Sequence, residues 1–194
     1  MYKRQVQETG RAGSYVAAHA YSDDAVTRAA ELGVRTIEHG SLIRDRAATA
    51  MAQRGAIMVP TLSPYHWVTR IGDRLGLPDQ HRERAAAVQE DALRAVALAQ
   101  RHGVALALGS DLFRTPREHQ SHELRLRAEV QPIADVLRSA TMIGARVVGL
   151  DDSLGQVRPG YLADLLVVDG NPLEDLSVLQ DQGAHLAVVM SGGR

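Results

Sequence analysis

Three short runs each carry, at or next to the C-terminal end, a residue of a type that binds metals: Val16-Ala17-Ala18-His19-Ala20, Thr36-Ile37-Glu38-His39-Gly40 and Leu108-Gly109-Ser110-Asp111. In a parallel β/α barrel, side chains at the C-terminal ends of the strands line the active site. From His19 to His39 there is room for one helix and one strand, and from His39 to Asp111 for a strand, a long loop and two helices. The spacing therefore predicts about two β/α units whose strand ends converge on a metal.

The composition is that of an ordinary soluble globular protein. Of 194 residues, 45% are hydrophobic and 23% are charged, and 22 Lys and Arg face 23 Asp and Glu. With a formal net charge of -1 and no basic run, neither nucleic acid nor an anionic membrane is expected as a partner. The chain has no cysteine, so disulfides and thiolate metal ligands are excluded and any metal must bind to histidine and carboxylate.

Strand-like and helix-like segments alternate, which predicts an α/β fold with parallel βαβ units. Ser22 is placed to cap a helix that ends near Gly33, and Gly55 is placed to end the next helix. Residues 63–80 have no clear period and contain two prolines and two glycines, so they are expected to form a loop over the site. Strands are expected at 15–20, 34–39, 56–62 and 104–108, and helices at 22–33, 47–55, 88–103, 118–130 and from 132.

Beyond Gly149 the pattern changes from alternating helix and strand to short strands and turns. Residues 162–169 and 185–190 read as strands, separated by the turn signal Asn171-Pro172. The sequence thus predicts two parts: 15–150, the C-terminal half of a hydrolase barrel, and 151–194, part of an accessory β-sandwich.

Several motifs in this order resemble metal-dependent amidohydrolases of the imidazolonepropionase-like and Xaa-Pro dipeptidase branch. They include the three runs quoted above and Ala140-Thr141. The most specific is Gly155-Gln156-Val157-Arg158-Pro159-Gly160, followed by Leu162-Ala163-Asp164-Leu165-Leu166-Val167-Val168-Asp169. The resemblance covers roughly residues 15–194. It implies a TIM-type barrel with a small β-sandwich, and hydrolysis of a C–N bond by metal-activated water.

Carried over by position, His19 resembles the metal ligand of the fifth barrel strand, His39 that of the sixth, and Asp111 the aspartate of the eighth. Neutral imidazoles suit zinc, so one or two divalent ions, most simply zinc, are the implied cofactor. Asp111 is also the implied general base and acid, taking a proton from the attacking water and passing it to the leaving nitrogen. Thr61 and Tyr65 follow the seventh strand, where the resemblance implies contacts with a small-molecule substrate, a dipeptide or a cyclic amide.

Two elements of the family pattern are missing from the chain: a His-x-His pair on the first strand and a carboxylated lysine on the fourth. His19 is the first histidine, and Lys3, the only lysine, precedes the first predicted strand. The expectation is a partial barrel holding strands five to eight. Such an open half-barrel exposes two strand edges and apolar surface, which favours self-association.

Plainer interpretations stay open for the same residues. Asp111 fits ordinary turn chemistry, and a lone histidine at a strand end is usually structural. His119 and His122 share a helix face without necessarily binding a metal, and His66 is expected on the surface or facing substrate. Glu38 is expected either to hold a histidine ring or to face solvent. His81, His102 and His185 are expected to be structural.

Three functions remain open: a hydrolase of amide, peptide or cyclic amide bonds, a ring deaminase of the same superfamily, and a catalytically silent fragment that only binds. No apolar stretch approaches the roughly 20 residues that span a bilayer, and residues 1–14 are polar. A cytoplasmic location is therefore expected, with a signal on a missing N-terminal segment left open.

Overall fold

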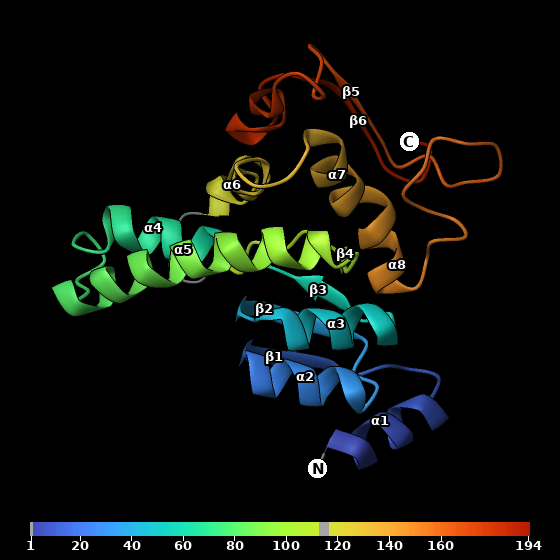
Figure 1. Cartoon of the computed structure of the whole chain (residues 1–194). Coiled ribbons are helices and arrows are strands. Elements are labelled where there is room, and N and C mark those ends of the chain that lie inside the picture. Colours follow the sequence, from blue (N-terminus) through green and yellow to red (C-terminus); the bar gives the residue numbers. More distant parts are fainter. Residues whose placement is uncertain (1, 113–116) are drawn as a thin grey trace.

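A computed structural model of the chain describes residues 2–112 and 117–194 (Figure 1). The first part of the chain alternates helices and strands: α1 (Tyr2–Arg11), β1 (Ala17–Ser22), α2 (Asp23–Glu31), β2 (Thr36–Leu42), α3 (Asp45–Arg54), β3 (Ile57–Val59), α4 (Ser63–Ile71), α5 (Asp79–Arg101) and β4 (Ala105–Leu106). The second part contains η1 (Arg117–His119), α6 (His122–Ala128), α7 (Ile133–Arg138), the π-helical η2 (Ser139–Ile143), α8 (Gly144–Val148), β5 (Leu165–Val168), η3 (Leu176–Leu179), η4 (Asp181–Gly183) and β6 (Leu186–Met190).

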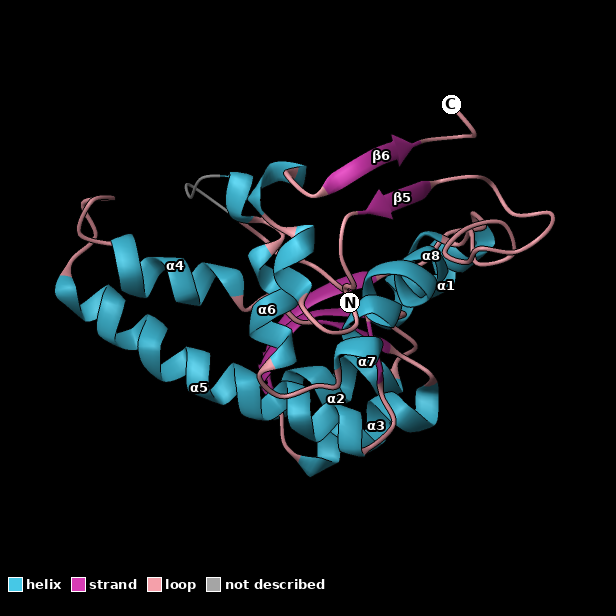
Figure 2. Ribbon diagram, turned by 90° about the horizontal axis from the view of Figure 1, so that it is seen from above, coloured by secondary structure: helices cyan, strands magenta, loops and turns pink. Residues whose placement is uncertain are grey.

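The first four strands form one parallel sheet in the order β1-β2-β3-β4, which confirms the predicted α/β class. Each strand pairs with the next one in sequence, as successive βαβ units require. Helices α2 and α3 lie along one side of the sheet (Figures 1 and 2). Ile37 of β2 and Met58 of β3 are fully buried in the core that these helices share with α5. That the four strands are half of a barrel stays a prediction.

Local signals set the ends of the first helices as predicted. The Ser22 side chain accepts a hydrogen bond from the Ala25 amide, which caps α2. Gly33 follows α2 with φ 88, and Gly55 ends α3 with φ 66. Both conformations suit glycine, which has no Cβ to clash in the left-handed region.

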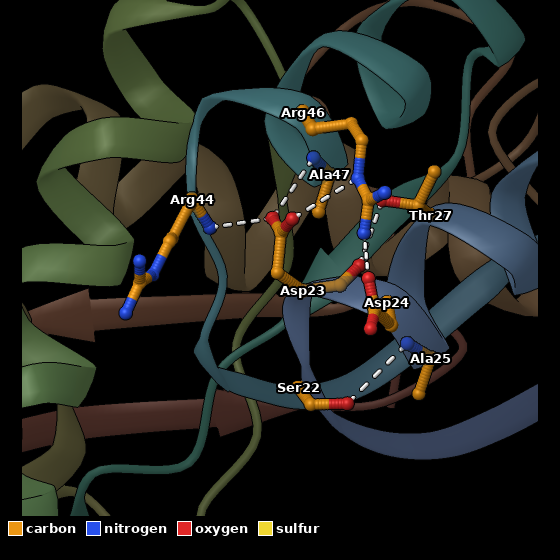
Figure 3. A network of polar contacts seen from close by, with 8 residues as sticks. All are labelled: Ser22, Asp23, Asp24, Ala25, Thr27, Arg44, Arg46 and Ala47. Carbon is orange, nitrogen blue, oxygen red and sulfur yellow. Dashed lines mark hydrogen bonds and ion pairs between the residues drawn. The ribbon is translucent and has the colours of Figure 1, made fainter.

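The N-terminus of α3 is capped by a residue of another helix. Arg44, the N-cap residue, makes no side-chain cap. Instead, Asp23 at the start of α2 accepts hydrogen bonds from the amides of Arg44 (2.8 Å) and Ala47 (3.1 Å) (Figure 3). Arg46 pairs with both Asp23 and Asp24. The carboxylate supplies the acceptor that the free amides of a helix start require.

The loop predicted at 63–80 is wrong in its first half, because Ser63–Ile71 form helix α4. Pro64 lies in the first turn, where a missing N–H costs nothing. The buried Glu123 of α6 then accepts hydrogen bonds from the Leu62 and Ser63 amides and the Ser63 hydroxyl, at 2.7–3.0 Å. This cap comes from 60 residues away, so the local sequence does not show it. The segment between the strand predicted at 104–108 and the helix predicted at 118–130 lies in part outside the described residues.

The C-terminal segment forms a two-stranded antiparallel hairpin of β5 and β6, as its strand signals predicted. Leu176, which lies between the two strands in the sequence, is buried against Leu124 of α6 and Val136 of α7. The division at 150–151 and the wider β-sandwich stay predictions. Among the described residues, no helix is both long and apolar enough to cross a membrane.

Candidate metal-binding site

His19 lies on the face of β1 that points away from the helices. Ala18 and Ala20 are buried in the core, whereas Ala17 and His19 are exposed. Because side chains alternate along a strand, Tyr21 points to the same side as His19. The open face of the sheet therefore carries an imidazole and a phenol at its C-terminal end.

His39 reaches that same face through an unusual backbone conformation. Regular alternation would place His39 with Ile37, on the helix-covered face. Its φ of 74 lies in the left-handed region and breaks the alternation. Gly40 follows with φ 60, and a Cβ there would lie 2.9 Å from the Met58 methyl group. The chain thus turns the His39 ring toward His19.

The two imidazoles meet directly. His39 Nε2 lies 2.9 Å from His19 Nδ1, and His39 Nδ1 lies 2.7 Å from Thr61 Oγ1. His39 and Thr61 are buried, with 6% and 5% of their surface exposed. Burial, together with the nearby His19, lowers the pKa of His39, while the Asp111 carboxylate opposes that shift. A neutral His39 ring is therefore favoured, as a metal ligand requires.

Two tyrosines complete the surroundings, and one of them was not anticipated from the sequence. The Tyr21 ring stacks on His39 at 4.8 Å between centroids and meets His19 edge-on. Its position two residues after His19 on one strand was the signal that could have identified it. The Tyr65 hydroxyl lies 3.1 Å from Ser41 Oγ, and burial raises the Tyr65 pKa, so the phenol stays protonated. Thr61 and Tyr65 remain predicted substrate contacts.

Asp111 and Glu38 bring carboxylates close to this pair. Asp111 is exposed and has a φ of 43, a second non-glycine residue in the left-handed region. Glu38 was expected either to hold a histidine ring or to face solvent. Its carboxylate instead accepts a hydrogen bond from Thr36 Oγ1 at 2.7 Å. Burial raises the Glu38 pKa, the Thr36 hydroxyl lowers it, and the Asp111 charge raises it further. The role of Asp111 as ligand and base stays a prediction.

The histidine pair lies near the spacing of two ligands on one metal ion. Nitrogen ligands at about 2.0–2.1 Å from a tetrahedral zinc are about 3.3–3.4 Å apart, so the two rings would have to separate by a few tenths of an ångström from the 2.9 Å found here. The Thr61 contact holds the other nitrogen of His39, as outer partners of ligating histidines do. Within residues 2–112 and 117–194, however, no three His, Cys, Asp or Glu side chains are grouped closely enough to hold a metal.

His66, His119 and His122 form a separate cluster, which corrects one expectation. His66 is not on a surface loop but on α4, with 7% of its surface exposed. Its ring lies 4.6 Å from that of His122, and Trp67 stacks on His119 at 4.1 Å. His119 and His122 therefore pack against α4 side chains.

Comparison with known proteins places the chain in a family. The model of the amidohydrolase family matches residues 1–194. The chain belongs to the amidohydrolase family. This amidohydrolase chain is 29% identical to ochratoxinase from Aspergillus niger over 193 residues, which are 97% of the chain and 39% of that protein.

Solved structures give the same result at higher identity. A prolidase complexed with N-methylphosphonate-L-proline is 40% identical, with a TM-score of 0.93 over 100% of this chain and 47% of that one. An Xaa-Pro dipeptidase with bound methionine is 30% identical, with a TM-score of 0.87 over 99% of this chain and 47% of that one. The chain thus spans about half the length, or less, of these relatives.

Proposed function

We propose that the chain is the C-terminal half of a metal-dependent hydrolase that cleaves C–N bonds, with strands β1 to β4 as barrel strands five to eight. The observation that carries this proposal is the His19–His39 pair, held at 2.9 Å at the strand ends in a chain of the amidohydrolase family. The prolidase, the Xaa-Pro dipeptidase and ochratoxinase are whole proteins about twice as long or more, so the remaining ligands are expected on the other half.

In this proposal His19 and His39 hold a divalent metal, for which zinc suits imidazole ligands best. A metal bound there would supply Lewis acidity and a water molecule of lowered pKa. Thr61 fixes the orientation of the His39 ring, and Tyr21 covers one face of that ring. The Asp111 carboxylate takes a proton from the attacking water and returns it to the leaving nitrogen. The protonated Tyr65 phenol donates a hydrogen bond to a substrate carbonyl or carboxylate.

The proposed substrates are small amides with a dipeptide-like shape. The similarity to a prolidase and an Xaa-Pro dipeptidase favours an acyl-proline bond over a cyclic amide or a ring amidine. A binding-only role for this chain alone is the second candidate, and the observation that favours it is the two-histidine pair without a third grouped ligand in the described residues.

The experiment that tests the site is zinc stoichiometry after dialysis. We expect the wild-type chain to retain zinc and the His19→Ala, His39→Ala double variant to lose it. The matched control is His81→Ala, His185→Ala, which removes two exposed histidines away from the pair. Equal retention by all three proteins would refute the site, and no retention by the wild type would favour the binding-only candidate.

A further inference from the structure

A cleft of about 400 Å³ lies between helices α4 and α6, apart from the His19–His39 pair. The two helices are in contact, and Figure 1 shows α6 near one end of α4. The cleft is lined by four cationic or potentially cationic side chains, one tryptophan and one carboxylate: Arg70, Arg125, His66, His122, Trp67 and Glu129. The function proposed above uses none of them.

The two histidines of the cleft are neutral donors near pH 7. Burial, together with the neighbouring His122 and the positive charges of Arg70 and Arg125, lowers the pKa of His66 to about 4. Burial and the same two arginines also lower the pKa of His122. Each neutral ring keeps one N–H to donate. After burial, the guanidinium groups of Arg70 and Arg125 contribute to the lowered pKa of both rings.

The two arginines of the cleft make no ion pair with any residue that the structure describes. In the described part of the chain, neither Arg70 nor Arg125 lies within ion-pair distance of a carboxylate. Glu129 is the single carboxylate on the lining, and Asp175 feels the Arg125 charge without pairing with it. The cleft therefore presents two guanidinium charges against one lining carboxylate.

We propose that this cleft binds a small oxyanion, a carboxylate or a phosphate group, between Arg70 and Arg125. Guanidinium groups bind both anions through paired N–H donors, and the hydrogen bonds are charge-assisted. The imidazole N–H groups of His66 and His122 add neutral donors on the inner wall. This site goes beyond the hydrolase proposal, because it uses neither the metal-binding pair nor Asp111.

The chain carries its own reporter for this site. Trp67 is the only tryptophan, lines the cleft and stacks on His119. We would titrate the full chain at pH 7.5 with sodium phosphate and, separately, sodium acetate, against sodium chloride at matched ionic strength. Trp67 emission and the imidazole ¹⁵N signals of labelled histidines are the two readouts. A saturable change with phosphate, acetate or both supports the site, and the arm that saturates identifies the anion class.

Variants separate cleft binding from a general salt effect. The Arg70→Gln, Arg125→Gln double variant is expected to weaken the apparent affinity at least about tenfold, whereas Arg54→Gln, an exposed arginine on α3, leaves it unchanged. Far-UV circular dichroism checks that the folds match. The proposal is overturned if neither readout saturates in the wild type, if chloride gives the same response, or if the double variant binds as well as the wild type. None of these results depends on catalysis, so the hydrolase proposal stands or falls separately.

Discussion

At the scale of single residues, the backbone of His39 decides whether the pair can form. A non-glycine residue in the left-handed region costs on the order of 1 kcal/mol and persists where surrounding contacts hold it. Here the contacts are the Thr61 hydrogen bond, the stacked Tyr21 ring and the adjacent Gly40. The strain lies at the residue that brings a second imidazole to the open face, which supports a functional reason for it.

Thr61 should matter for metal affinity through His39 alone. Thr61→Val keeps the shape and removes the hydroxyl that lies 2.7 Å from His39 Nδ1. Because loss of such an outer partner typically costs 10–100-fold, we expect zinc affinity to fall by about that factor. The measurement is competition with a chromophoric chelator.

Thr49→Val is the matched control for Thr61→Val, since Thr49 also contacts a histidine ring, that of His102 at 3.3 Å. His102 lies away from the pair and also contacts Asp45. An equal affinity loss in both variants would contradict the role given to Thr61.

At the scale of elements, two helices begin with caps supplied by distant carboxylates. Asp23 of α2 caps α3, and Glu123 of α6 caps α4. Each of these carboxylates links the start of one helix to a neighbouring helix. Because α3 follows β2 and α4 follows β3, the two caps also fix the loops after those strands. Thr61, the partner of His39, directly precedes the Leu62 amide that Glu123 holds.

Whether a helix is capped by a residue beside it in the sequence or by a distant one explains which helices the sequence could predict. Helix α2 has its own cap in Ser22 and a glycine after its end, and both were recognised. Helix α4 has no local side-chain cap, and its pattern of two prolines and two glycines nearby suggested a loop. Pro64 falls in the first turn and Gly72 at the C-terminal end, so these residues bound the helix instead of interrupting it, and the cap at its start comes from Glu123. The site followed the same rule: the residue types of the candidate ligands could be read from the sequence, whereas the φ of His39 could not.

Replacing Glu123 should destabilise the fold strongly. Its side chain is fully buried, accepts from three donors and lies near the buried Arg127. In Glu123→Gln an amide NH₂ would face those donors, and the nearby Arg127 charge would lose the favourable influence of the carboxylate. Leaving a buried donor unpaired costs about 1–3 kcal/mol, so we expect a loss of about 3 kcal/mol in the free energy of unfolding. Urea denaturation measures it.

Glu129→Gln, at the C-cap of the same helix, is the control for Glu123→Gln, since the Glu129 side chain is exposed. Surface changes of this kind usually stay within about 0.5 kcal/mol. Similar losses in both variants would mean that Glu123 adds little beyond ordinary helix effects.

At the scale of the whole molecule, the histidine cluster should make stability depend on pH. The pKa of His66 falls from about 6.5 in the unfolded chain to about 4 in the folded one. A depressed pKa contributes stability that is fully present above pH 6.5 and is lost as the pH falls toward 4. We expect the free energy of unfolding to drop by about 1–3 kcal/mol across that window. Urea denaturation at pH 7.5, 5.5 and 4.5 tests this.

His66→Gln removes the titrating group and should flatten the decline between pH 6.5 and 4. His122 shifts in the same direction, so part of the decline should remain. His81→Gln, at an exposed position, should keep the wild-type profile. A His66→Gln profile as steep as that of the wild type would assign the pH dependence to other groups.

The β5–β6 hairpin is the region of the molecule where self-association is expected. Leu166 pairs with Val189 on one face and Val167 with Val188 on the other, and these side chains are 43–65% exposed. A two-stranded hairpin with apolar side chains exposed on both faces is marginal alone and is stabilised by covering either face. We therefore expect concentration-dependent association, measured by sedimentation equilibrium.

Val189→Lys should weaken this association at least about tenfold, because a charge would have to be buried in the contact. Val157→Lys, at an 87% exposed position outside the hairpin, should leave it unchanged. Equal association in all three proteins would move the contact to another surface, of which the open edge of β1 is the first to examine.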